Sequence, residues 1–94
     1  MSKKVKVTVR LSAPLSERIG SRGEIDVEAA TVRESLHQVG DQYPTFKKLI
    51  WSDNDQINPA LLVFHKDQKL NANDLEKPVQ SNDQIDVIPA ISGG

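Results

Sequence analysis

The sequence contains no cysteine among its 94 residues. Disulfide scaffolds, cysteine-ligated zinc, thiol nucleophiles and cysteine-ligated iron–sulfur clusters are therefore excluded. The absence is in keeping with a cytoplasmic protein, because disulfides belong to oxidising compartments. A chain of this length forms one domain, and its 37% of hydrophobic residues can form a core without covalent staples.

Long apolar runs and an excess of one charge are also missing. No stretch approaches the roughly 20 apolar residues of a membrane span, and the opening MSKKVKVTVR lacks the apolar segment of a signal peptide. The 12 basic residues are balanced by 13 acidic ones, for a net charge of -1. We therefore expect neither a membrane nor a nucleic acid as partner, and we interpret Lys4, Lys6 and Arg10 as the solvated side of a strand.

The side-chain groupings of enzymes and metal sites are not found either. Two of the five glycines are terminal, so there is no Gly-rich phosphate loop, and no serine has a nucleophile motif around it. The two histidines, His37 and His65, have no further ligands at a metal-site spacing. The stretch 53–55 (DND) resembles the start of a calcium loop, but Asn58 and Phe64 replace the glycine and glutamate that such a loop needs. We predict that the protein is not an enzyme and holds no metal or cofactor.

Alternating side chains predict strands in the first third of the chain. Residues 4–11 and 24–28 alternate between apolar and polar types, which is typical of half-buried strands. Residues 13–23 (APLSERIGSRG) lie between them and are expected to form a polar loop, with Gly20 and Gly23 as turn signals. The pattern predicts a hairpin with a long connection.

A helix is predicted next. Thr31 followed three residues later by Glu34 forms a capping box, and Pro44 ends the helix at or before Tyr43. Four residues at helical spacing are expected to face the core: Val32, Leu36, Val39 and Tyr43. The signal weakens over residues 45–58, where an apolar side indicates a short helical turn before a loop.

The last third returns to strands. The apolar run 60–64 predicts a strand, followed by a turn at 66–68 and a short return strand. Residues 81–83 (SND) predict a tight turn before a final strand, 84–88. Pro89 ends this strand because proline has no N–H to donate to the ladder.

This order of elements predicts an α+β domain of the β-grasp type. We expect a mixed sheet of four to five strands, with the first and last strands side by side and one main helix across one face. The domain spans residues 1–88, and residues 89–94 form a flexible C-terminal tail.

The tail ends in Gly93-Gly94. Two glycines add no packing and are entropically costly to order. They can, however, thread a narrow channel and leave the last carbonyl unhindered. A carboxylate becomes a good electrophile once ATP converts it to an acyl-phosphate anhydride, so such an end can be loaded with, or joined to, a nucleophile.

The segment from Leu61 through HKDQKLNANDLEKPVQSNDQIDVIPAISGG resembles the ThiS/MoaD family of ubiquitin-like sulfur carriers. That family has a tight turn, here residues 81–83, then an apolar strand and a proline- and glycine-containing ending, here IPAISGG. The helix opening EAATVRESL is similar to the family's TVGELL segment. The resemblance covers most of the chain and implies a ubiquitin-like β-grasp fold.

By this resemblance, Gly94 supplies the carboxylate that an E1-like adenylyltransferase activates with ATP. Sulfur from a persulfide donor then displaces AMP and leaves a thiocarboxylate, and a sulfur-accepting synthase takes that sulfur into a metabolite. Gly93 and Gly94 run into the partner's active site, with Ile91 and Ser92 leading into it. The implied protein is a co-substrate, or the small non-catalytic subunit of a synthase, and a monomer when free.

The resemblance also implies a partner surface. The family's alignment turns alternate residues of the strand at 60–64 and its end toward the helix, namely Leu61, Val63 and His65. Leu62 and Phe64 then lie on the open face of the sheet, where Ile88 joins them, and an apolar cluster there marks a partner surface. The alternative is that residues 45–58 fold over this face and cover it.

Two other functions share the same fold and tail. One is a ubiquitin-like modifier joined through Gly94 to target lysines, and the other is a β-grasp interaction module whose tail does no chemistry. Residues 45–58 are longer than in compact ThiS-like chains and more like those of MoaD-type or CysO-type carriers. The acceptor is left open between a molybdopterin precursor, an activated serine, a thiazole precursor and a siderophore intermediate.

Overall fold

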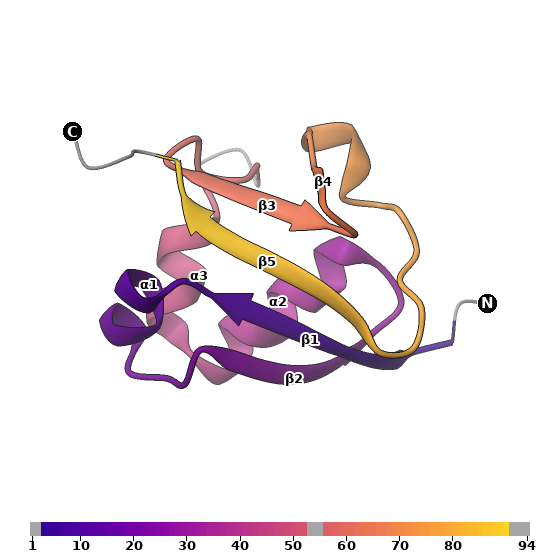
Figure 1. Cartoon of the computed structure of the whole chain (residues 1–94), viewed down its shortest axis with the longest axis horizontal. Coiled ribbons are helices and arrows are strands. Elements are labelled where there is room, and N and C mark those ends of the chain that lie inside the picture. Colours follow the sequence, from indigo (N-terminus) through magenta and orange to yellow (C-terminus); the bar gives the residue numbers. More distant parts are fainter. Residues whose placement is uncertain (1–2, 53–55, 91–94) are drawn as a thin grey trace.

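The computed structural model describes residues 3–52 and 56–90, which form one mixed sheet with helices against one face (Figure 1). The strands are β1 (Val5–Leu11), β2 (Glu24–Ala29), β3 (Leu61–His65), β4 (Gln68–Lys69) and β5 (Asp83–Pro89). Their order in the sheet is β2-β1-β5-β3-β4. The predicted β-grasp architecture, with four to five strands, is confirmed.

The first and last strands lie side by side, as predicted. β1 and β5 pair in parallel, with Val9 opposite Ile85, and they form the middle of the sheet. β1 pairs with β2 in antiparallel fashion, and β5 does the same with β3. Two residues of left-handed backbone, Lys66 and Asp67, close the tight β3–β4 hairpin.

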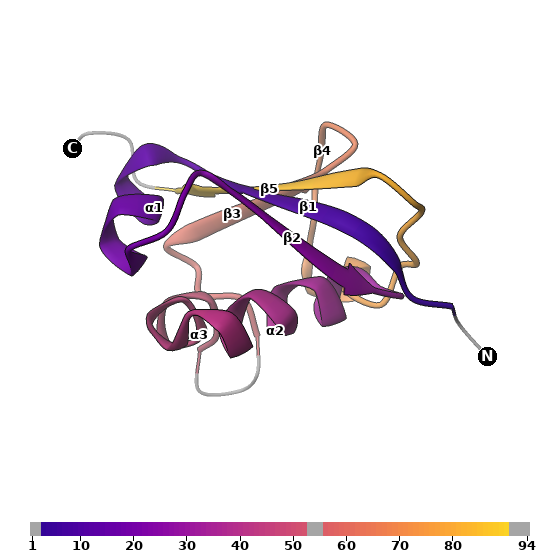
Figure 2. The ribbon, with the colours of Figure 1, turned by 90° about the horizontal axis from the view of Figure 1, so that it is seen from below.

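The helices are α1 (Ala13–Ile19), α2 (Val32–Gln42), α3 (Pro44–Ile50) and the short 3-10 helix η1 (Ala72–Asp74). Figure 2 shows α2 and α3 beneath one face of the sheet. The predicted cap of α2 is present, because Thr31 Oγ1 accepts a hydrogen bond from the Glu34 N–H at 3.1 Å. The Glu34 carboxylate accepts from the N–H of Ala30 at 2.6 Å, which is one residue earlier than in a standard capping box.

The core fills the space between the sheet and the α2–α3 pair. The core-facing residues of α2 were predicted correctly for Val32, Leu36 and Val39, which have no exposed surface, whereas Tyr43 is only partly buried against the core. Gly40 lets the two helices approach closely, since a Cβ there would lie 3.1 Å from the Cβ of Lys47.

The predicted polar loop at residues 13–23 is wrong, because seven of its residues form α1. Proline in the first turn favours a helix start, since its missing N–H needs no partner there. Gly20 ends the helix with a left-handed φ of 72°. Leu15 packs into the core and Ile19, one turn later, packs against it, so two apolar side chains fix this short helix on the sheet.

Residues 45–58 do not cover the open face of the sheet within their described part. Phe46 and Ile50 of α3 are buried in the core on the helix side, and Trp51 stacks on His37 of α2 with ring centroids 4.6 Å apart. Figure 2 shows α3 on the same side of the sheet as α2. The alternative in which this segment shields the apolar cluster is therefore not supported by the described residues.

Candidate functional site

The predicted tail residues Ile91, Ser92, Gly93 and Gly94 lie outside the described residues, so the structure shows where the tail begins. β5 ends at Pro89, and the N–H of Ala90 donates to the carbonyl of Ala60 at 2.7 Å. The tail thus starts at the end of β5, beside the first residues of β3. The predicted division between residues 88 and 89 stays a prediction.

Three apolar side chains lie on the open face next to this point. Leu62 is directly opposite Ile88 in the β3–β5 pair, and Phe64 lies two residues along the same strand. All three are partly buried, whereas the alternate residues of β3 are buried beneath the sheet. The predicted orientation is confirmed, and we call Leu62, Phe64 and Ile88 the apolar patch. Its use as a partner surface stays a prediction.

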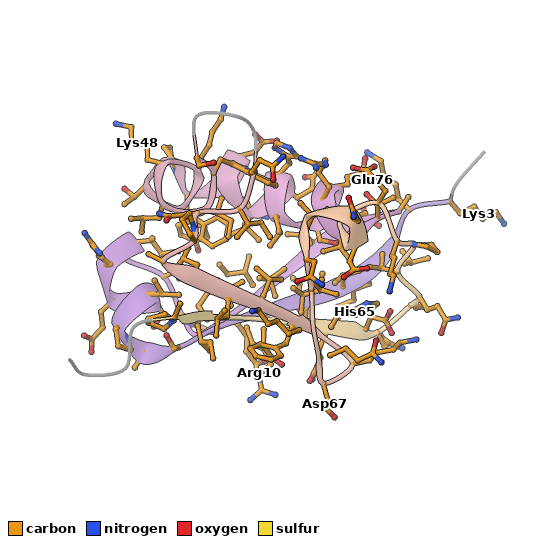
Figure 3. All side chains as sticks on the ribbon, turned by 90° about the horizontal axis from the view of Figure 1, so that it is seen from above. Lys3, Arg10, Lys48, His65, Asp67 and Glu76 are labelled. Atoms are coloured by element: carbon orange, nitrogen blue, oxygen red, sulfur yellow. The ribbon has the colours of Figure 1, made fainter. Side chains whose placement is uncertain are left out.

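A charged row borders the apolar patch. Arg10 of β1 lies between two carboxylates, with its Nε 4.0 Å from Glu24 and 3.6 Å from Asp86. Figure 3 shows Arg10 and Asp67 projecting from the sheet on the side away from the helices. A hollow of about 490 Å³ lies between these charged groups and the apolar residues Phe64 and Ile88.

Sequence reasoning treated Arg10 only as a solvated strand residue and did not single out Asp86 or Asp67. Arg10 and Asp86 meet because the parallel β1–β5 pair places them opposite each other. Phe64 of β3 lies opposite Asp86 on the other side of β5. The strand register is a tertiary property, so only a correct pairing of β1 with β5 could have found this group.

The predicted tight turn at residues 81–83 has a second role that the sequence did not reveal. Asn82 takes a left-handed φ of 70°, and Asp83 Oδ2 accepts from the N–H of Gln80 at 2.8 Å. The same oxygen lies 2.9 Å from Nε2 of His65 on β3. Burial raises the pKa of Asp83, but the bonds from Gln80 and His65 and the charge of Lys66 lower that pKa overall. The contact links β3 to β5 at the end of the sheet opposite the tail.

Both histidines therefore have structural partners: His65 contacts Asp83, and His37 stacks on Trp51. Within residues 3–52 and 56–90 no three metal-ligating side chains come together. Among the described helices none has the length and apolar character to cross a bilayer. The described residues thus bring together an apolar patch, a flanking row of ion pairs and the start of the tail at Ala90.

Known proteins were compared with the whole chain. A family model described as the ThiS family matches residues 9–94. No curated protein sequence gives a significant match.

Several solved structures share the fold. Small archaeal modifier protein 1 from Methanosarcina acetivorans is 24% identical, with a TM-score of 0.82 over 97% of this chain and 98% of that one. A chain of the Amycolatopsis orientalis BexX/CysO complex is also 24% identical, with a TM-score of 0.81 over 94% and 99%. A putative molybdopterin converting factor, subunit 1, from Pyrococcus furiosus is 17% identical, with a TM-score of 0.68 over 93% and 99%. At these identities the structures establish the ubiquitin-like β-grasp fold, and the family model, which matches all but the first eight residues, establishes that the chain belongs to the ThiS family.

Proposed function

We propose that this protein is a sulfur carrier that is loaded at the carboxylate of Gly94. The observation that carries the proposal is the family match, which runs through residue 94 and so includes the diglycine. The apolar patch beside the start of the tail supports the proposal, because it offers a place where a partner could dock. The protein then acts as a co-substrate, and the catalysts are its partners.

The proposed chemistry begins with an E1-like adenylyltransferase. The Gly94 carboxylate attacks the α-phosphate of ATP, which forms an acyl adenylate and releases pyrophosphate. A sulfur nucleophile, hydrosulfide or the terminal sulfur of a persulfide, then attacks the acyl carbon, and the C–O bond to AMP breaks. With hydrosulfide the product is the thiocarboxylate directly; with a persulfide, a second thiol must reduce the S–S bond to release it. We propose that this chemistry takes place in the cytoplasm, where ATP is available.

The apolar patch supplies the contact that holds each partner during these steps. Leu62 and Ile88 lie across from each other beside Ala60, whose carbonyl holds the N–H of Ala90. The four residues beyond Ala90, fully extended, reach at most about 14 Å. A partner's reactive centre must therefore lie within that distance of Ala90, and a partner seated on the patch can satisfy this condition because the patch lies beside the start of the tail.

The acceptor of the sulfur belongs to the same proposal. The similar structures include a CysO complex and a putative molybdopterin converting factor, so we propose a synthase of cysteine or molybdopterin formation as the second partner. A second candidate function is protein modification, favoured by the similarity to a small archaeal modifier protein. In that case a lysine amine attacks the acyl adenylate and forms an isopeptide bond.

Intact-mass spectrometry tests the proposal. The protein is incubated with ATP, sulfide and the E1-like enzyme of its host, and a variant lacking Gly94 serves as the control. Replacement of one oxygen by sulfur in the full chain alone supports the carrier function. Stable amide conjugates without sulfur would identify a modifier, and no change of either kind would leave an interaction module with an idle tail.

A further inference from the structure

The outer edge of β2 carries backbone groups that no described strand uses. β2 is the terminal strand of the sheet, and the described residues place nothing beyond it. The Leu11 N–H donates to the carbonyl of Gly23 at 2.7 Å, and the register continues with Val9 opposite Ile25. Because bonding alternates in an antiparallel pair, the N–H and C=O groups of Glu24, Asp26 and Glu28 point away from β1.

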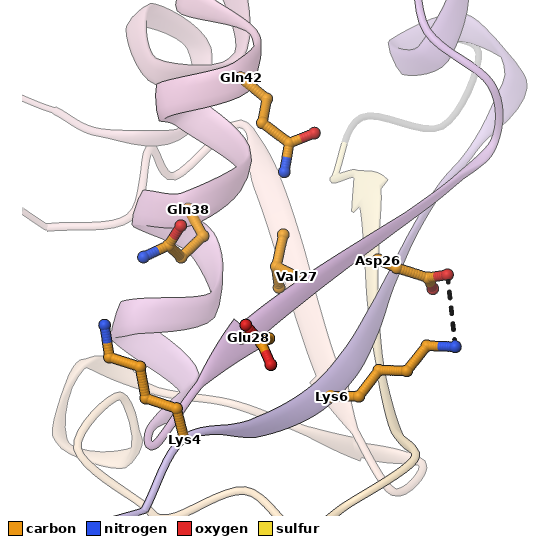
Figure 4. Close-up of a pocket in the computed structure, with 7 residues that line it drawn as sticks. All are labelled: Lys4, Lys6, Asp26, Val27, Glu28, Gln38 and Gln42. Carbon is orange, nitrogen blue, oxygen red and sulfur yellow. Dashed lines mark ion pairs between the residues drawn. The ribbon is translucent and has the colours of Figure 1, made fainter.

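A hollow runs along this edge, between β2 and α2. Its volume is about 510 Å³, and Val27 of β2 faces Gln38 and Gln42 of α2 across it. Lys4 and Lys6 also line the hollow, and their ammonium groups lie 3.7 Å from the carboxylates of Glu34 and Asp26. Figure 4 shows Gln42 reaching from α2 toward β2. Within the described part of the chain neither glutamine amide has a hydrogen-bond partner. Each amide offers donors and an acceptor to a chain laid in the hollow.

The side chains of β2 define the charge of a strand that could add there. Glu24, Asp26 and Glu28 are exposed in one row on the open face. β1 already meets two of them with complementary groups: Lys6 Nζ lies 3.7 Å from Asp26, and Arg10 Nε lies 4.0 Å from Glu24. A strand added on the other side of β2 would face the same three carboxylates. Basic residues at alternate positions, as in β1, would therefore complement them.

A second copy of this chain does not supply such a basic strand when it pairs through its own β2 edge. Two β2 edges paired with each other would place carboxylate opposite carboxylate, which is destabilising. Charged edges of this kind oppose self-pairing while leaving the backbone groups accessible.

We propose that the β2 edge binds, by strand addition, an extended segment of a partner protein that carries Lys or Arg at alternate positions. The backbone of Glu24, Asp26 and Glu28 provides the hydrogen bonds, and their side chains select the basic residues. The site is independent of the chemistry at Gly94. β1 separates it from Ile88 on β5, and both β1 and β5 separate it from Leu62 and Phe64 on β3, so the edge and the apolar patch can be occupied together.

The test is an NMR titration of isotope-labelled protein with the peptide KTKVTVR, which has the basic alternation of β1. The matched control is ETEVTVE, in which acidic residues replace the basic ones. We expect amide shifts from the first peptide at residues 24–28 and at the side chains of Gln38 and Gln42. Added salt should weaken the binding, because the charge pairs are exposed.

Two substitutions at Glu28, which has no ion pair within the described residues, sharpen the test. Glu28→Lys should weaken KTKVTVR binding about fivefold, since one cross-strand attraction becomes a repulsion. Glu28→Pro removes an outward N–H without breaking a bond to β1, and it should abolish the shifts. Glu17→Lys makes the same change of charge on the exposed side of α1 and should leave binding unchanged.

Equal binding of the two peptides, no binding at millimolar peptide, or shifts centred away from β2 would each overturn the proposal. So would an equal loss in the Glu17→Lys control. Concentration-dependent shifts of the β2 amides without peptide would assign the edge to self-association instead. Circular dichroism of each variant establishes that it is folded before binding is compared.

Discussion

Leu36→Ala tests whether α2 holds the sheet in place as described. Leu36 lies in the middle of α2 and has no exposed surface. The change removes three carbon groups, which at about 0.8 kcal/mol each corresponds to a loss of about 2.4 kcal/mol. The cavity left behind adds to this loss to the extent that the helix cannot move inward.

α2 is held at both ends, so little collapse is expected. At its start the N–H groups of Val32 and Arg33 donate to the carbonyls of Lys77 and Leu75, at 3.1 and 2.8 Å. At its end Gly40 packs against α3. We therefore expect the free energy of unfolding to fall by about 3–4 kcal/mol, in the middle of the range for buried leucines.

Urea unfolding followed by circular dichroism measures this change. With a slope of about 1 kcal/mol per molar urea for a small domain, the midpoint should fall by about 3–4 M. Gln42→Ala, at an exposed position of the same helix, should stay within about 0.5 kcal/mol of the wild type. A loss below about 1 kcal/mol for Leu36→Ala would mean that the space beneath the sheet closes, and the description of a rigidly held α2 would be refuted.

Three further predictions concern the tail, the acid stability and the apolar patch. Deleting Gly93 and Gly94 should leave the melting temperature unchanged, because termini add little packing, and should abolish sulfur loading; an unfolded deletion variant would contradict this. The folded-state pKa of Asp83 is lowered from 3.8. The stabilisation of the fold by its ionised carboxylate is therefore complete above about pH 4 and is lost as the pH falls through the lowered pKa. Asp83→Asn should thus be about 1–2 kcal/mol less stable than the wild type at pH 7, and the difference should shrink as the pH falls below about 4; a difference that stays constant on acidification would argue against the Asp83–His65 contact. Ile88→Ser should raise the KM of the E1-like enzyme for the protein about tenfold while the domain stays folded, and an unchanged KM would remove the apolar patch from the interface.

Local sequence signals were enough for most elements of the fold. The alternation in β1 and β2 and the Thr31–Glu34 box are short-range patterns, and they placed these elements correctly. α1 was missed although both of its ends carry helix signals, a proline in the first turn and a glycine at the C-cap. Leu15 and Ile19 have helical spacing, but two apolar residues in a seven-residue segment are too short a pattern to establish a period, so the glycine was interpreted as a loop signal instead.

The site was predictable only where it follows from a single strand. Leu62 and Phe64 share a face because they are two residues apart, and period-2 geometry requires it. The Asp83–His65 contact joins residues 18 positions apart, and the Arg10–Asp86 pair joins the two ends of the chain. Such contacts depend on strand pairing and not on any local pattern, which is why they first appeared in the structure.

The central place of β5 also has a consequence for how the molecule is made. β5 leaves the ribosome after every other strand, yet it lies between β1 and β3, and without it those two strands have no common neighbour. A nascent or truncated chain that stops before Asp83 therefore cannot close its sheet and remains a target for proteolysis. Each folded copy in a cell must consequently contain β5, so the fold screens out chains that end before the start of the tail, whereas a chain that lacks only Gly93 and Gly94 still folds.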